Sequence, residues 1–505
     1  MKRICSLLVM IGLAPLGANA QTATGNGRTN KVPKFAYVAN ENSSNVSAYA
    51  IDRTTGALTS VPGSPFAAGS LPFSVVVDPS GKFAYVANFA SNNVSAYTID
   101  RTTGALSPVP GSPFAASTNP FSVAVDPSGN FAYVANGCGD PACSLGNVSA
   151  YTIDRTTGAL SPVPGSPFAA GSFPSSVTVD SSGNFTYVAN FFSNNVSAYS
   201  INRTTGALSP IPGSPFAAGS NPRSVTAHPS ANFAYVANGG GNISAYTIDR
   251  TTGALSPVPG SPFAAGSNPP SVAVDPTGNF AYVANASSDN VSAYSIDRTT
   301  GSLSPVPGSP FAEASIPFSV AVDPSGKFAY VANEGSSNVS AYTIDQTTGS
   351  LSPVPGSPFA AGTLPFSVAI AGQSTVPFAA FALEAEIALG PLGAFEVKGN
   401  FTLGEGSNGI NPLTEDVKLQ VGTFSTTIPA GSFHQDHRGR FKFEGVINGV
   451  SLEVQIVPLG GNDFQFKAEA QGADMMDIVN PVSVELTIGD DGGSATVTAA
   501  FDLSL

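Results

Sequence analysis

The 505-residue chain carries a net charge of −13, yet only 10% of its residues are charged. This balance argues against nucleic acid and anionic membranes as partners, because phosphate binding needs Lys and Arg. Hydrophobic residues make up 42% of the chain and include 33 Phe, enough to build a core, whereas the excess of Gly, Pro, Ser and Thr over helix-forming residues argues against a helical protein.

The first 20 residues have the form of a secretory signal peptide. Lys2 and Arg3 precede a short apolar run, and Ala18-Asn19-Ala20 provides a small-x-small cleavage site. The apolar run is too short to span a membrane, so we expect export to the periplasm or the exterior and no transmembrane segment. A buried first helix is the alternative interpretation. Residues 21–32 are expected to be an N-terminal linker.

An internal repeat fills residues 33–370. The hexapeptide Phe-Ala-Tyr-Val-Ala-Asn, with Thr for the first Ala in one copy, recurs every 47 or 48 residues apart from one step of 54. Its seven copies begin at Phe35, Phe83, Phe131, Phe185, Phe233, Phe280 and Phe328. Units of this length that each hold several short strands are typical of propeller blades.

Each unit predicts four strands. In the third unit these are Ser122–Val125, Phe131–Ala135, Val148–Ile153 and Ala159 to about Val163. Asp126-Pro127-Ser128-Gly129 suits a type I turn between the first two strands. The fourth strand contains prolines, which cannot donate to a ladder, so we expect it at the outer edge of each sheet.

The two ends of the repeat region complement each other. The unit at Phe35 has no first strand, and Phe366-Ser367-Val368-Ala369-Ile370 is a first strand with no second strand after it. This predicts an all-β, seven-bladed propeller that is closed by a C-terminal inner strand. An open solenoid is the competing architecture.

Function is best sought where one unit departs from its siblings, because an active site needs unlike groups at one point. The position that opens each inner strand should face the central channel and form its mouth; it is occupied by Phe73, Phe121, Ser175, Arg223, Pro270, Phe318 and Phe366. The charged departures on this face are Arg223, Glu41, Glu313 and Glu334, which are the candidate catalytic residues. Unrelated surface charges are the alternative.

Two further groups of residues are expected to be structural. Six arginines on the opposite face, each beside an Asp or Asn, are interpreted as solvated turns: Arg53, Arg101, Arg155, Arg203, Arg250 and Arg298. His228 replaces the usual turn Asp and is interpreted as a turn residue. The insertion in the third unit contains Cys138 and Cys143, which we expect to form a disulfide in an oxidising compartment, with a metal site or free thiols as alternatives.

The repeats resemble those of the YVTN/lactonase-like β-propeller family, which includes propeller-type 6-phosphogluconolactonases. The resemblance rests on Phe-Ala-Tyr-Val-Ala-Asn, Asn-Val-Ser-Ala-Tyr-x-Ile-Asp-Arg-Thr-Thr-Gly and Asp-Pro-Ser-Gly. It implies that a Pro-Arg-His stretch would supply Arg and His at a catalytic mouth. Here the matching stretch is Pro222-Arg223-Ser224, so the Arg is present and the His is absent. A general base would then have to come from a glutamate.

The C-terminal part differs in charge. Residues 371–505 carry 6 Lys and Arg against 17 Asp and Glu. Residues 371–380 are expected to be a linker. Residues 381–505 alternate apolar and polar side chains, which predicts an antiparallel β-sandwich of seven or eight strands with a hairpin turn at Asp490-Asp491-Gly492-Gly493. A Ca²⁺ site at that turn or around Glu405, and metal binding by His434 and His437, are less favoured than turn and surface roles. No metal or cofactor is expected.

Three functions fit the sequence. The first is an exported binding or surface-interaction module that holds a protein or a small molecule at an apolar channel mouth. The second is a lactone hydrolase of the propeller-type 6-phosphogluconolactonase class, and the third is a purely structural envelope protein. Fold alone does not separate them, because propellers host many activities.

Overall fold

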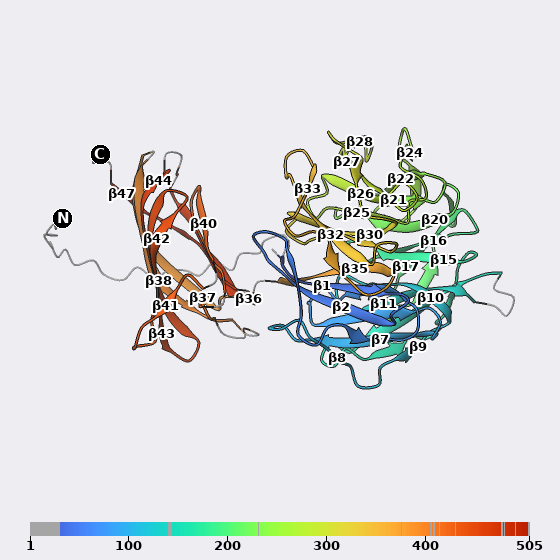
Figure 1. Cartoon of the computed structure of the whole chain (residues 1–505), viewed down its shortest axis with the longest axis horizontal. Helices are drawn as coiled ribbons and strands as arrows, with labels where there is room; N and C mark the ends of the chain where they lie inside the picture. The colour runs from blue at the N-terminus through green and yellow to red at the C-terminus, as the bar shows by residue number, and fades with distance from the viewer. Residues whose placement is uncertain are drawn as a thin grey trace, which may run out of the picture.

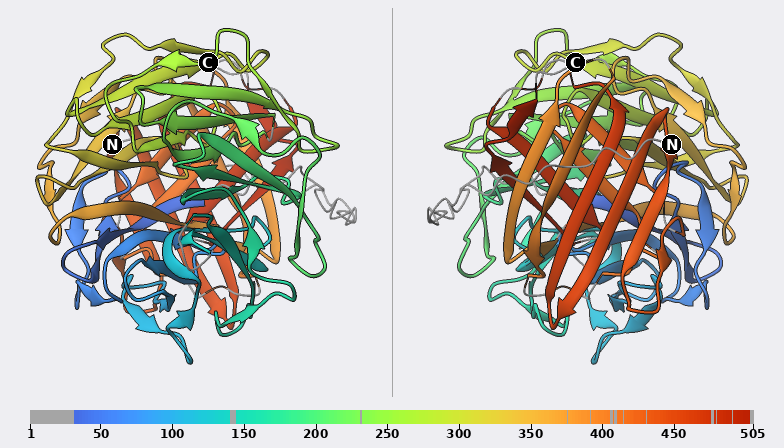
Figure 2. Two further views of the ribbon diagram at one scale, coloured as in Figure 1. Left: turned by 90° about the vertical axis from the view of Figure 1, so that its right-hand side faces the viewer. Right: turned by 90° about the vertical axis from the view of Figure 1, so that its left-hand side faces the viewer.

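The computed structural model describes residues 31–502 apart from residues 140–143, 231, 375, 391, 405–406, 408–409, 414, 430, 476–477, 479 and 490. All regular elements in these residues are β-strands. Seven small sheets follow one another around a ring, and two larger sheets lie beside the ring (Figures 1 and 2). The predicted signal peptide lies outside the described residues.

A typical blade is formed by β5 (Pro72–Val77), β6 (Phe83–Asn88), β7 (Asn93–Ile99) and β8 (Leu106–Pro108), in that order and antiparallel. Every residue of β6 is buried, because the strand is covered on both faces by neighbouring sheets. The predicted outer strand is in fact two short pieces. Both β8 and β9 (Phe114–Ala115) pair with β7, separated by a proline-containing turn.

Five more blades repeat this pattern. Their inner strands are β10 (Thr118–Val125), β15 (Pro174–Val179), β20 (Pro222–Ala227), β25 (Ser271–Val274) and β30 (Pro317–Val322). The second strands are β11 (Phe131–Cys138), β16 (Phe185–Asn190), β21 (Phe233–Asn238), β26 (Phe280–Asn285) and β31 (Phe328–Asn333). The third strands are β12 (Asn147–Ile153), β17 (Asn195–Ile201), β22 (Asn242–Ile248), β27 (Asn290–Ile296) and β32 (Asn338–Ile344). The outer pieces are β13 (Leu160–Pro162), β14 (Phe168–Ala169), β18 (Leu208–Pro210), β19 (Phe216–Ala217), β23 (Leu255–Pro257), β24 (Phe263–Ala264), β28 (Leu303–Pro305), β29 (Phe311–Ala312), β33 (Leu351–Pro353) and β34 (Phe359–Ala360).

The remaining blade joins the two ends of the repeat region, as predicted. Its order is β3 (Leu58–Ser60), β2 (Asn45–Ile51), β1 (Lys31–Asn40) and β35 (Pro365–Ser374), with β4 (Phe66–Ala67) also on β2. β1 and β35 are antiparallel, with Tyr37 opposite Ala369. This blade shares one apolar cluster with β6 and another with β31, so it packs against both neighbours and the units form a ring rather than a row.

Two sheets follow the ring. One has the order β36 (Val376–Pro377), β46 (Asp491–Val497), β45 (Val482–Ile488), β39 (Val417–Val421), β40 (Phe424–Ile428). The other has the order β41 (His434–Gln435), β42 (Phe441–Ile447), β43 (Val450–Gly460), β44 (Asp463–Ala473), β38 (Gly393–Thr402), β37 (Ala380–Ala388), β47 (Ala500–Asp502). They share a single apolar cluster, so they form a sandwich.

The sandwich differs from the expectation in three details. The described residues form twelve strands, β36 to β47, rather than seven or eight, and two short edge pairs, β36–β46 and β37–β47, are parallel. The predicted linker at 371–380 lies mostly in strands β35, β36 and β37. Asp491 and the two glycines after it belong to β46 and pair with β45, with Asp491 opposite Ile488, so these three residues lie in a strand rather than in the predicted turn.

The sandwich lies beside one face of the ring. β35 is the inner strand of the closing blade and is the last propeller strand before β36 in the chain, and the guanidinium of Arg53 donates to the carbonyl of Gly489 at 3.4 Å. Arg53 belongs to the turns between the third and fourth strands, so the sandwich covers the face that carries these turns. The opposite face, which carries the predicted channel mouth, is turned away from the sandwich (Figure 1).

Candidate functional site

Two rings of seven residues surround the channel mouth. The first ring is the predicted set at the start of the inner strands, and the second ring follows the Val-Ala-Asn end of each second strand: Glu41, Phe89, Gly137, Phe191, Gly239, Ala286 and Glu334. Backbone hydrogen bonds join the second ring to residues that lie two positions before the first ring. For example, the amide of Glu334 donates to the carbonyl of Ile316 at 2.9 Å, and that of Glu41 to the carbonyl of Leu364 at 2.9 Å.

One half of the mouth is aromatic. The ring centroids of Phe73 and Phe366 are 4.3 Å apart, and those of Phe318 and Phe366 are 4.0 Å apart. Phe121 lies 5.6 Å from Phe366 although a whole blade separates them in the ring, so these side chains meet at the channel axis. Phe89 stacks on Phe73 at 4.6 Å. The aromatic cluster therefore fills the channel mouth on this side.

The other half is polar and hollow. A cavity of about 470 Å³ lies between Arg223 and Glu334 and is also lined by Asn268, Ala286, Ser287, Asp289, Ser315, Ile316 and Phe318. It occurs where the second ring has the small residues Gly239 and Ala286 in place of the phenylalanines on the aromatic side. The side chains at this repeated position therefore differ in size from blade to blade.

Arg223 is held in this half with an unsatisfied donor. Its Nε is buried and has no hydrogen-bond partner, and its guanidinium lies over the Phe191 ring at 5.0 Å. Burial lowers the pKa of Arg223, and the negative charge of Glu334 opposes that shift. A half-buried guanidinium is suited to hold an anionic or strongly polar oxygen.

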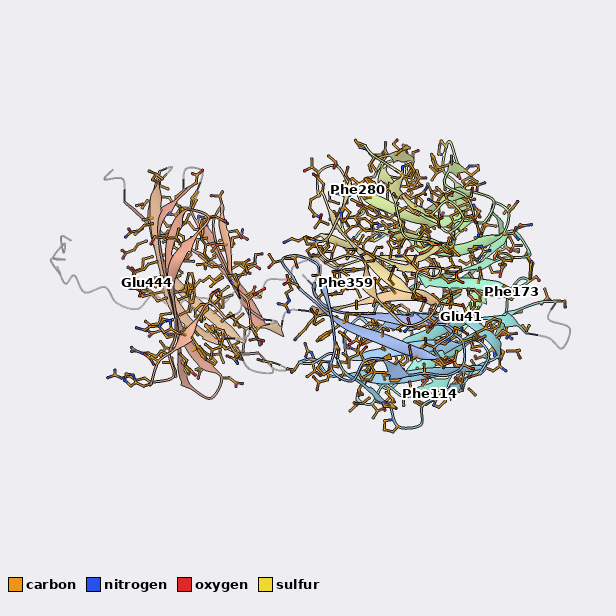
Figure 3. All side chains as sticks on the ribbon, in the orientation of Figure 1. Glu41, Phe114, Phe173, Phe280, Phe359 and Glu444 are labelled. Carbon is orange, nitrogen blue, oxygen red and sulfur yellow. The ribbon has the colours of Figure 1, made fainter. Side chains whose placement is uncertain are left out.

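Glu334 and Glu41 form an electrostatic unit with Arg223. Burial raises the pKa of Glu334, while the attraction of Arg223 lowers it. Burial also raises the pKa of Glu41, and repulsion from Glu334 raises it further. Figure 3 labels Glu41 and Phe173, both on the side of the ring away from the sandwich. Three of the four charged departures, from three different blades, therefore interact electrostatically on this face.

The comparisons with known proteins agree with this architecture. The chain matches the profile of a protein family described as "Lactonase, 7-bladed beta-propeller". The matches cover residues 14–119, 108–220 and 215–364, which together are more than half of the chain. The chain belongs to the 7-bladed β-propeller lactonase family. No curated protein matches it.

Solved structures share the fold of this family member at low identity. A periplasmic gluconolactonase of Pseudomonas aeruginosa is 18% identical with a TM-score of 0.58, covering 67% of this chain and 99% of that one. A protein described as a putative 6-phosphogluconolactonase from Bacteroides uniformis is 17% identical with a TM-score of 0.56, covering 67% of this chain and 100% of that one. Another so described, from Bacteroides fragilis, is 20% identical with a TM-score of 0.56, covering 68% of this chain and 99% of that one. The likeness covers the propeller and shows its fold.

The fourth candidate of this lactonase-family propeller, Glu313, is placed differently from the other three. Its carboxylate accepts hydrogen bonds from Tyr342 Oη at 2.8 Å, the Ala314 amide at 2.8 Å, Asn333 Nδ2 at 3.3 Å and Ser340 Oγ. Burial raises the pKa of Glu313, and these donors oppose the shift. Its oxygens are thus engaged inside one blade, and Glu313 is absent from the lining of the cavity between Arg223 and Glu334.

Two of the residues predicted to line the channel mouth of this lactonase-family propeller are buried and have little solvent-exposed surface. Ser175 is buried, and its hydroxyl donates to the carbonyl of Pro222 in the next blade at 2.9 Å. Pro270 is also buried. Sequence reasoning missed Phe89, Phe173 and Phe191, which extend the aromatic side. Phe89 and Phe191 stand at the same repeated position as Glu41 and Glu334, so that alignment of the units could have found them.

The residues interpreted as structural in this lactonase-family chain have structural contacts. Arg155 and Arg203 donate to the carbonyls of Ser128 at 2.5 Å and Ser182 at 3.2 Å within their own blades. His228 is buried; its Nδ1 accepts from the Ser230 amide at 3.0 Å, as an Asp does in the equivalent turns, and its Nε2 is 2.9 Å from the Gly278 carbonyl of the next blade.

The structure describes some of the residues expected to form the disulfide or considered as metal ligands. Cys138 is disulfide-bonded, and its expected partner Cys143 lies outside the described residues, as does Glu405. His434 and His437 are exposed. In the part of the chain that the structure describes, no three His, Cys, Asp or Glu side chains are grouped so that they could hold a metal ion, and no helix is long and apolar enough to cross a membrane.

Proposed function

We propose that this protein is a lactone hydrolase that works at the mouth of the propeller. The observation that carries the proposal is that Arg223 and Glu334, from two different blades, line one cavity and interact electrostatically, with Glu41 from a third blade close enough to Glu334 to be affected by its charge. Hydrolysis of an ester needs a base for water and a positive group for the oxyanion, and this set contains both. Membership of the lactonase family supports the same reaction class.

In the proposed reaction Glu334 accepts a proton from water as the water oxygen attacks the lactone carbonyl. The guanidinium of Arg223 stabilises the oxyanion of the tetrahedral intermediate. The bond between the carbonyl carbon and the ring oxygen then breaks, and the ring oxygen takes the proton from Glu334. The product is an open-chain hydroxy acid; its carboxyl group releases the second proton of the water to solvent, and the resulting carboxylate pairs with Arg223. Glu334 thereby fills the role of the histidine that is replaced by Ser224.

Burial tunes this base. It raises the pKa of Glu334 against the opposing effect of Arg223, and the charge of Glu334 raises the pKa of the neighbouring Glu41. A carboxylate with a raised pKa is a stronger base than an exposed one. Activity should therefore increase with pH as Glu334 loses its proton, at a pH above the 4.5 of an ordinary glutamate.

We also propose export, with the reaction taking place outside the cytoplasm. The signal-like residues 1–20 and the likeness to a protein described as a periplasmic gluconolactonase support this location. The disulfide at Cys138 supports an oxidising compartment.

Lactone hydrolysis by the purified full chain tests the proposal. Arg223→Ala should lower kcat/KM by about 100-fold or more, and Glu334→Gln by about 100- to 10,000-fold. Arg203→Ala on the opposite face is the matched control and should leave the rate within about twofold, since its guanidinium contacts only a turn carbonyl at 3.2 Å.

The second candidate is a binding module for a protein or small molecule, which the aromatic half of the mouth favours. A wild-type protein that hydrolyses none of the lactones tried, yet binds a ligand at the mouth, would decide for this candidate.

A further inference from the structure

We infer that the substrate is an uncharged lactone with an apolar substituent, rather than a phosphorylated sugar lactone. This inference rests on the proposed hydrolase function and names the substrate class for the same cavity. It follows from what lies beside Arg223 and Glu334: a continuous aromatic wall on one side and an excess of negative charge on the rim.

The aromatic wall begins inside the cavity. Phe318 lines the cavity, and its ring lies 4.0 Å from Phe366. Phe366 continues to Phe73 at 4.3 Å, and Phe73 to Phe121 at 5.0 Å. A lactone ring held between Arg223 and Glu334 would thus have an apolar surface next to it, and a substituent on the ring could pack there with loss of water from both surfaces.

The rest of the cavity lining is mostly polar or small. Asn268, Ser287 and Ser315 line it together with Ala286. These groups can donate to or accept from the two ester oxygens of a lactone. The cavity therefore has one polar side for the ester and one apolar side for a substituent, which matches an amphipathic lactone.

The charge on the rim disfavours a phosphate group. Among the described residues that line the cavity Arg223 is the one cation, and Glu334 and Asp289 line it too. Glu41 adds a third carboxylate that interacts with Glu334. A phosphate dianion is usually bound by several cationic donors or backbone amides, and here the charge of one arginine is already opposed by nearby carboxylates. A neutral substrate avoids this repulsion.

The test compares matched lactones on the purified full chain. δ-Decalactone and δ-valerolactone share one ring and differ only in an apolar tail, and 6-phosphogluconolactone supplies the charged sugar. We expect kcat/KM for δ-decalactone to exceed that for each of the other two by at least about tenfold, mainly through KM, because several methylenes would be buried on the aromatic wall.

Phe318→Ser tests the wall, since Ser175 is the residue at the same position in another blade. The variant should lose most of the preference for δ-decalactone over δ-valerolactone, measured as the ratio of the two kcat/KM values. If Phe318→Ser does not fold, as judged by its melting curve, Phe73→Ser is measured instead. A folded variant that keeps the full preference would overturn the role of the wall.

The remaining outcomes separate the two proposals. Equal or faster hydrolysis of 6-phosphogluconolactone would overturn the substrate class and leave the hydrolase function intact. Absence of turnover of all three lactones would overturn the hydrolase function. In that case, binding of δ-decalactone to the wild type but not to Phe318→Ser, measured by ligand-observed NMR, would still support the apolar specificity of the cavity, and equal binding to both would overturn it.

Discussion

The hydroxyl of Tyr330 donates a hydrogen bond of 3.0 Å to the carbonyl of Gly56, although 274 residues separate them in the chain. Tyr330 belongs to the last blade and Gly56 to the first, so the bond crosses the seam where the ring closes. The same bond joins every other neighbouring pair of blades, as between Tyr187 and Gly253 at 2.9 Å. The seam is thus held both by the β1–β35 pairing and by the contact that the interior blades use.

Removing this bond should loosen the seam. Tyr330→Phe leaves the Gly56 carbonyl without its buried partner and should cost about 1–3 kcal/mol in the free energy of unfolding. Tyr187→Phe removes the equivalent bond between interior blades and should cost a similar amount. Amide hydrogen exchange should be faster in β1 and β35 only in Tyr330→Phe. Equal exchange of these strands in both variants would contradict a special role for the seam.

Stability should depend on pH through His228. Burial lowers the pKa of His228, so the folded protein resists protonation more than the unfolded chain, whose histidine has a pKa near about 6.5. The contribution of neutral His228 to the free energy of unfolding is complete above the unfolded-state pKa. It is lost as the pH falls toward the lower pKa of the folded state, by up to about 2 kcal/mol at pH 5.

The matched control for this titration is His228→Asp, which restores the turn residue of the other blades. Asp126 accepts the amide of Phe131 at 2.7 Å in such a turn. Urea unfolding of both proteins at pH 7.5 and pH 5.0 should show the wild type losing stability relative to the variant. If the difference in unfolding free energy between the wild type and His228→Asp is the same at both pH values, the titration of His228 does not explain the pH dependence.

Ile316 has an unfavourable backbone conformation for its residue type. Its φ is +53°, in the left-handed region, where a β-branched side chain is disfavoured. Asn221 and Asn268 occupy the same repeated position with φ of +54° and +53°, and Asn tolerates this region. Ile316→Asn should therefore raise the free energy of unfolding by about 1 kcal/mol. Ile316→Val, which keeps the branching, should give no gain in chemical denaturation.

Glutamates form an unfavourable row across the outer sheet of the sandwich. Glu453 lies opposite Glu444 on one side and Glu469 on the other, and the row continues to Glu396 and Glu386. Like charges directly opposite each other destabilise a sheet, so Glu453→Gln should stabilise the protein by about 0.5 kcal/mol at low salt.

Salt provides the check on this explanation. Glu485 is a suitable control because its cross-strand neighbours are Gln420 and Ser494. Glu485→Gln should have little effect, and the gain from Glu453→Gln should shrink when NaCl screens the row. A gain that persists unchanged at 0.5 M NaCl would rule out charge repulsion as its cause.

Part of the proposed site could be predicted from the sequence. Arg223, Glu41 and Glu334 could be selected because they break the repeat, and their blade positions follow from topology. Glu313 breaks the repeat as well, yet its carboxylate is engaged by Tyr342, Ser340 and Asn333 within the blade. The orientation of a carboxylate side chain depends on hydrogen-bond donors from other strands. Tertiary packing, rather than local sequence, places those donors next to it.

The propeller itself was determined by the sequence alone. A period of 47 or 48 residues, four short strands in each period and complementary half-units at the two ends leave a closed ring as the simplest way to bury every blade face. Only the tertiary structure decided the hollow and the aromatic halves of the mouth, and the twelve strands of the sandwich. The physical reason is that repetition fixes local backbone form, whereas a cavity or a sheet edge depends on which side chains and strands distant parts of the chain place next to one another.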